Sequence, residues 1–241
     1  MLHSIVYSTL GQLATGILLF MALVPPSRIG KGFARFHAGL AIVLWLIATR
    51  AELSAPLVIT CGLLVLALML SAWDAPYYAC LAGAFVSSLY LLILPDLAAR
   101  GAEVALLVHV PALLVLGGSA VAMLLGHWYL VAPGLSITYL KSVTIGLILA
   151  LLIRGSLVIR LLLAEGARLN SIYFYDMYGI FLMQRVALGL LLTLVLAVMT
   201  YYCVRIRSTQ SATGILYVVL VFCLVGEIIG GYLFRKTGLG F

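Results

Sequence analysis

The chain has 241 residues, of which 65% are hydrophobic and 9% are charged. A soluble domain carries about 25% charged residues, so this composition excludes a soluble globular protein and indicates that lipid solvates much of the surface. The net charge of +7 does not indicate nucleic-acid binding, because the 14 lysines and arginines are scattered rather than gathered on one helix or arm.

Apolar segments follow one another along the chain, each close to the roughly 20 residues that a helix needs to cross the hydrocarbon core. The predicted spans are residues 4–24, 33–48, 56–73, 76–94, 104–131, 140–164, 177–204 and 212–234. The loops between them are too short to fold as a soluble domain. We therefore predict an all-α polytopic transmembrane bundle of about eight spans that forms one domain over residues 1–241, and we expect it in the bacterial inner (cytoplasmic) membrane.

Among the ionisable residues inside predicted spans, four lie well away from the span ends, at depths where a charge is costly and marks an ion pair or a function. An even number of spans puts both chain ends on one side of the membrane, named here the terminal side. At 1.5 Å per residue, Arg154, Arg185, Glu227 and His109 all fall in the half of the bilayer next to the terminal side. Two arginines and one glutamate at similar depth predict a charge-paired cluster.

This predicted cluster has two interpretations. In the first, Glu227 and one arginine form a structural pair that fixes helix packing. In the second, the polar residues line a pocket that opens toward the terminal side and binds the head group of an amphipathic ligand such as a quinol, or carries protons through Glu227 and His109. Gly226 and Gly230 form a small-xxx-small pair beside the acid, which favours close helix packing.

The histidines raise a haem alternative. His109 and His127 are 18 residues apart, or five helical turns, so they share one face of their helix. His37 is predicted near the same membrane surface as His127, and His3 is predicted near the same surface as His109. Two such histidine pairs, on opposite sides of the membrane, are the arrangement of axial ligands that a di-haem b subunit needs. The separation of about 27 Å along the helix is long for two haems in one bilayer. The aromatic residues after His127 instead favour an interfacial anchor there.

Motifs of autonomous enzymes are absent from the sequence. There is no HExxH, GxSxG or P-loop pattern and no pair of aspartates at prenyltransferase spacing, so we predict no catalytic residue and no activity without partner subunits. The cysteines lie in or at the end of apolar segments without CxxC or Cys/His ligand spacing, which predicts small buried side chains and neither an Fe–S cluster nor a zinc or other metal site.

The last predicted span and its approach carry a family resemblance. A polar, small-residue stretch at residues 208–217 leads to Gly226-Glu227, and the helix leaves through an aromatic and basic exit at residues 234–236. This pattern resembles the closing helix of the quinol-binding membrane-anchor subunits of the DMSO reductase and polysulfide reductase group. The resemblance implies about eight helices, short loops, a quinone site near one membrane face to which Glu227 contributes, and a partner that carries the redox centres.

The leading hypothesis is an integral membrane subunit of a respiratory or electron-transfer complex, an oxidoreductase as a whole. In this hypothesis the chain anchors redox partners and contributes a quinone or proton site formed by Glu227, Arg185, Arg154 and His109. The alternatives are a small transporter or channel with Glu227 and the arginines on its path, a purely structural membrane subunit, and a haem b-binding cytochrome subunit. The expected partners are membrane lipid and the other subunits of such a complex, and no nucleic acid.

Overall fold

A computed structural model describes the backbone of residues 1–132, 134–172 and 177–240, and the side chains of these ranges outside 165–172 and 177–178. The described residues form helices and no β-strand, which confirms the predicted all-α class. The elements are α1 (Leu2–Met21), α2 (Pro26–Ile29), α3 (Lys31–Ala48), α4 (Ala55–Met69), α5 (Asp74–Arg100), α6 (Ala102–Val131), α7 (Thr138–Ile172), α8 (Met177–Val186), the π-helix η1 (Ala187–Leu192), α9 (Thr193–Arg205) and α10 (Thr209–Thr237).

Within the described ranges, seven stretches are long and apolar enough to cross a membrane, and the chain is an integral multi-pass membrane protein. Helices α8, η1 and α9 follow one another without a break and supply one of these stretches, Gly179–Arg205. The predicted span 56–73 differs from the rest, because α4 is helical only over Ala55–Met69. Its 15 residues measure about 22 Å, less than the hydrocarbon thickness of about 30 Å.

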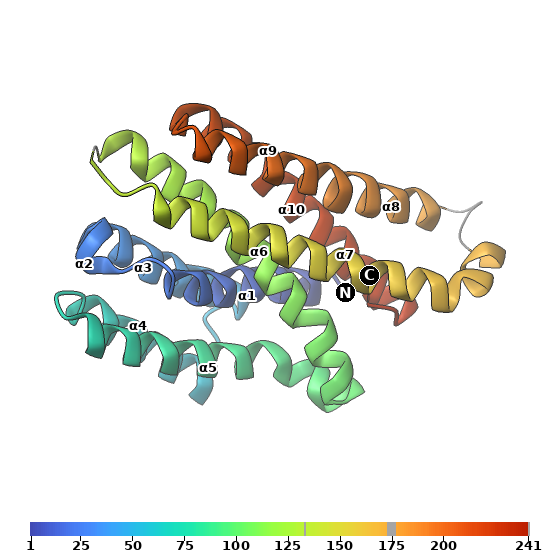
Figure 1. Ribbon diagram of the computed structural model, residues 1–241. Helices are drawn as coiled ribbons and strands as arrows, with labels where there is room; N and C mark the ends of the chain where they lie inside the picture. Colours follow the sequence, from blue (N-terminus) through green and yellow to red (C-terminus); the bar gives the residue numbers. More distant parts are fainter. Residues whose placement is uncertain (133, 173–176, 241) are drawn as a thin grey trace.

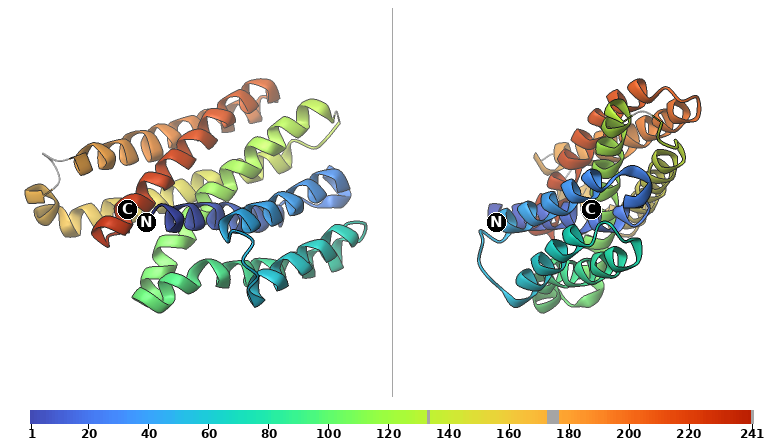
Figure 2. Two further views of the ribbon diagram at one scale, coloured as in Figure 1. Left: turned by 180° about the vertical axis from the view of Figure 1, so that it is seen from behind. Right: turned by 90° about the vertical axis from the view of Figure 1, so that its left-hand side faces the viewer.

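The long helices lie side by side in a bundle with α6 at its centre (Figure 1). Helix α6 packs against α1, α5, α7 and α10, and its apolar stretch is the most deeply buried of the seven. The α4–α5 pair lies at one edge of the bundle, and α8 and α9 lie at the opposite edge (Figures 1 and 2). Helix α10 packs against α6, α8 and α9, and so joins the centre of the bundle to that second edge.

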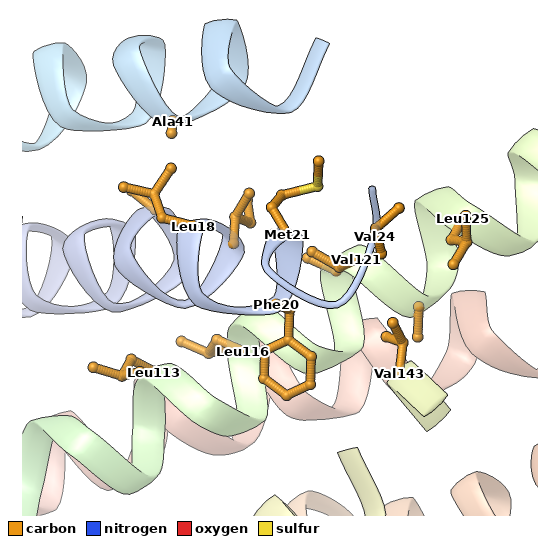
Figure 3. Close-up of a cluster of buried hydrophobic side chains, with 14 of the residues drawn as sticks. Leu18, Phe20, Met21, Val24, Ala41, Leu113, Leu116, Val121, Leu125 and Val143 are labelled. Carbon is orange, nitrogen blue, oxygen red and sulfur yellow. The ribbon is translucent and has the colours of Figure 1, made fainter. Parts of the chain in front are cut away.

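The backbones of α1 and α6 touch at a pair of glycines. A Cβ on Gly16 would lie 2.0 Å from a backbone oxygen of α6, and a Cβ on Gly117 would lie 2.1 Å from the carbonyl carbon of Gly16. Any larger residue would therefore separate the two helices. One turn along α1, the Phe20 ring fills the space above Gly118 of α6 and Gly146 of α7, within the buried cluster shown in Figure 3.

Helix α5 continues past the point where the sequence predicted its end. The predicted span 76–94 stops at Pro95, which lacks an N–H to donate to the carbonyl of Leu91. In the structure the Tyr7 hydroxyl of α1 donates to that carbonyl instead, and α5 runs on to the residue before Gly101. The additional turn carries Asp96 into the interior, where it is 1% exposed.

Candidate functional site

Three of the four predicted site residues are in direct contact. Glu227 of α10 accepts two hydrogen bonds from Arg154 of α7, from Nε to Oε1 at 3.3 Å and from Nη2 to Oε2 at 3.0 Å. Arg185 of α8 donates from Nη2 to Oε1 of the same carboxylate at 2.7 Å. All three residues are at most 3% exposed. The ion pairing that their shared depth predicted is present, and these residues are named here the Glu227 cluster.

Glycines and a π-helical turn make room for Arg185. The π-helix η1 begins two residues after it and widens the backbone spiral at this point. Gly189 of η1 lies directly against Gly226 of α10, since a Cβ on either residue would lie 2.8 Å from the Cα of the other. A Cβ on Gly226 would also lie 2.9 Å from Nη1 of Arg185. The close helix packing predicted beside Glu227 is therefore what admits the guanidinium.

His109 belongs to a different set of contacts. Its Nε2 lies 2.9 Å from Oδ2 of Asp96, and its Nδ1 lies 3.0 Å from Nε2 of Gln12. Because a carboxylate accepts, Nε2 of the imidazole carries the hydrogen, and the neutral Nδ1 accepts from the Gln12 amide. All three side chains are buried, and they bring together α1, α5 and α6.

Arg235, near the end of α10, completes this second set, named here the Asp96 cluster. Its Nη1 donates to Oδ1 of Asp96 at 2.9 Å, and its Nη2 donates to Oδ2 at 3.1 Å and to the Ser8 hydroxyl at 3.1 Å. Arg100 lies one turn after Asp96, at 4.0 Å from its carboxylate. The side chain of Arg235 is 19% exposed and that of Arg100 is 30% exposed, so the Asp96 cluster reaches the surface on the terminal side.

The sequence reasoning missed Asp96, Gln12 and Arg235 as site residues. The predicted span 76–94 ends before Pro95 and therefore leaves Asp96 outside the membrane core. A signal was present, since Asp96 and Arg100 have the i, i+4 spacing of an ion pair on one helix. Gln12 also had a signal, because it is an amide in the middle of an apolar span.

A cavity of about 20 Å³ separates the two clusters. This volume holds about one water molecule. It is far below the roughly 300 Å³ at which small-molecule sites begin. Besides Thr9, the polar side chains that line it come from both clusters: Ser8, Gln12, His109, Arg154, Glu227 and Arg235.

The remaining histidines have separate surroundings. His37 is buried, and its Nδ1 lies 2.8 Å from the carbonyl oxygen one turn earlier in α3. His127 is exposed and lies 3.4 Å from the Tyr217 hydroxyl, and His3 is exposed at the start of α1. His109 uses both ring nitrogens for Asp96 and Gln12 and leaves none for iron. The residues present therefore do not fit a haem held by His109.

Comparisons with protein-family models, with curated proteins and with solved structures gave no match. The cysteines Cys61, Cys80, Cys203 and Cys223 are free. Among the residues that the structure describes, no three His, Cys, Asp or Glu side chains gather as metal ligands do. The two polar clusters and the cavity between them are the features from which a function can be argued.

Proposed function

We propose that this chain is the membrane subunit of an electron-transfer complex and supplies that complex with a proton site inside the bilayer. The observation that carries the proposal is the water-sized cavity between two buried carboxylate clusters. Ionisable groups at membrane depth are costly, and they concentrate on ion and proton pathways. In this proposal the redox chemistry belongs to partner subunits, and the chain contributes proton transfer.

The outer half of the proposed route is the Asp96 cluster. Arg235 is the partly exposed end of this cluster and holds the Asp96 carboxylate in place. His109 exchanges a proton at Nδ1 with a water molecule in the cavity that it lines when the Gln12 side chain turns its amide, so that the amide oxygen accepts where the amide N–H donated before. The imidazolium is then stabilised by the Asp96 carboxylate at its other nitrogen, 2.9 Å away.

The inner half of the proposed route is Glu227. Its carboxylate accepts three hydrogen bonds from the two arginines, one of them at Oε2. An ionised carboxylate has about four lone-pair sites, so Oε2 keeps capacity to accept from a water in the cavity. His109 also lines that cavity, and one water molecule would therefore connect the two halves.

The proposal is tested with Glu227→Gln in the complex isolated from the native membrane. Glutamine keeps the volume and one acceptor oxygen, so we expect unchanged assembly and a loss of proton-coupled turnover of about 100-fold, the scale of general acid–base catalysis. Glu52→Gln, at an exposed loop residue, is the matched control and should leave turnover unchanged.

Other outcomes support the competing functions. A Glu227→Gln complex that fails to assemble would show that the cluster is a structural device, an alternative favoured by the hydrogen bonds at both carboxylate oxygens. Proton flux through the purified chain alone, measured in liposomes with a pH-sensitive dye, would establish a channel or transporter. A b-type absorbance spectrum of the purified chain would establish a haem subunit.

A further inference from the structure

A larger cavity, of about 430 Å³, lies at the terminal side between α6, α7 and the segment that follows α10. This volume is within the range of small-molecule sites, about 300–1,000 Å³. Its walls are mainly apolar and include Val104, Leu107, Val108, Leu157, Leu161 and Leu239. It lies outside the Glu227 cluster, although Val108 borders both this cavity and the water-sized one.

The segment after α10 is shaped to form one wall. Gly238 ends the helix with a φ of +79°, in the left-handed region that glycine adopts without strain. The chain then turns across α6, where a Cβ on Gly240 would lie 3.0 Å from Val108. This close approach places Leu239 in the lining, so the cavity is a built feature of three elements.

Two opposite charges line the same cavity. Glu103 comes from the first turn of α6, and Arg160 comes from α7. Both side chains are exposed, and within the described part of the chain neither has an ion pair or a hydrogen bond. The cavity therefore offers one carboxylate acceptor and one guanidinium donor that are not committed to each other.

We infer that this cavity binds one phospholipid whose head group carries both a phosphate and a primary ammonium group, an aminophospholipid. Arg160 donates to the phosphate, and Glu103 accepts from the ammonium. A purely anionic head group would bring a second negative charge to Glu103, and a quaternary ammonium has no hydrogen to donate. This inference goes beyond the proposed proton site and does not depend on it.

The neighbouring surface suits the rest of such a lipid. Leu107 and Leu106 of α6, and Ile159 and Leu163 of α7, are large apolar side chains that the protein leaves exposed near the charged pair. In a bilayer these side chains contact acyl chains. A head group held at the Glu103–Arg160 pair would therefore direct its acyl chains along α6 and α7.

The test is native mass spectrometry of the full chain in detergent with equal amounts of phosphatidylethanolamine, phosphatidylcholine and phosphatidylglycerol of matched acyl chains. We expect one retained phosphatidylethanolamine, favoured about fivefold over the other lipids. Glu103→Arg and Arg160→Glu should each abolish this preference. The double variant Glu103→Arg/Arg160→Glu should recover it, because a zwitterionic head group can bind in the reverse orientation.

The double variant keeps the inference open to refutation. Recovery in the double variant supports a charge-matched site, whereas loss in both single variants without recovery overturns it. Preferential retention of phosphatidylglycerol that Arg160→Glu removes would overturn it in favour of an anionic-lipid site. Equal retention of all three lipids by the wild-type chain would also overturn it. Helix content and thermal midpoint are measured for each variant, and Glu103→Gln and Arg160→Gln replace any single variant that does not fold.

Discussion

The Glu227 cluster and the Asp96 cluster both pair a buried carboxylate with arginine, but in different surroundings. Each has one buried carboxylate that accepts hydrogen bonds from an arginine through both of its oxygens. Arg185 in the first cluster is 0% exposed, whereas Arg235 in the second has a side chain that is 19% exposed. The first cluster is closed by glycine packing, and the second reaches the membrane surface.

This difference indicates that loss of a charge partner destabilises the protein more in the closed Glu227 cluster than in the Asp96 cluster. In a closed, low-dielectric site, water cannot solvate a charge that has lost its partner. A long side chain near the surface can extend its charged end into the head-group region. The same substitution in the two clusters should therefore have unequal effects, and four substitutions measure that inequality.

Glu227→Leu should have the largest effect, because it leaves Arg154 and Arg185 without their shared carboxylate. We expect a loss of about 3–5 kcal/mol in the free energy of unfolding, measured by denaturant titration in detergent micelles. The loss should exceed that of Glu227→Gln, which retains an acceptor oxygen. A loss below about 1 kcal/mol would contradict the assignment of Glu227 as the central residue of a closed cluster.

Asp96→Leu makes the same change in the open cluster. We expect a smaller loss, about 2–3 kcal/mol, because Arg235 can turn toward the surface while His109 loses its acceptor inside. The same titration gives the comparison directly. If Asp96→Leu were as costly as Glu227→Leu, partial exposure would not be what distinguishes the two clusters.

The contrast between the clusters also shows what could be predicted from the sequence. Helix direction and the fixed rise per residue placed Glu227, Arg154 and Arg185 at one depth, and opposite charges at one depth predicted an ion-paired cluster. The Asp96 cluster could not be found in this way. Where α5 continues past Pro95, the carbonyl that proline leaves without a donor accepts from the Tyr7 hydroxyl of another helix, a tertiary contact that the local sequence does not show.

The apolar helices were predictable in position but not in every detail. Hydropathy located the segments because apolar length is set by membrane thickness. The early end of α4 and the π-helix η1 depend on local packing and carry no hydropathy signal. The environment of His109 likewise depends on which face of α1 meets α6, because that contact places Gln12 against the ring.

Gly226→Ala tests the glycine packing that closes the first cluster. The added methyl would lie 2.8 Å from the Cα of Gly189 and 2.9 Å from Arg185, so we expect a loss of about 1–2 kcal/mol. Gly214→Ala on the same helix is the matched control, because a Cβ there has no neighbour within 4 Å. The control should be neutral or slightly stabilising, and a similar loss at both positions would indicate a general effect on α10 rather than packing at the cluster.

Arg100→Ala should lower the stability of the protein the least of the four substitutions, because Arg100 lies at the surface end of the Asp96 cluster. Its guanidinium lies 4.0 Å from Asp96 and 4.2 Å from the Phe234 ring centre, with a side chain that is 30% exposed. Such contacts contribute about 1 kcal/mol or less. Thermal midpoints at low and high salt provide the measurement, and a larger, salt-independent loss would place Arg100 inside the cluster rather than at its rim.

The short helix α4 has a consequence for the lipid around the protein. Its 15 residues span about 22 Å, while the core of a typical bilayer is about 30 Å thick. Such a hydrophobic mismatch is relieved by local thinning of the membrane. We therefore expect a dimple in the bilayer along the α4 edge of the bundle, where short-chain lipids would gather and long-chain lipids would be excluded.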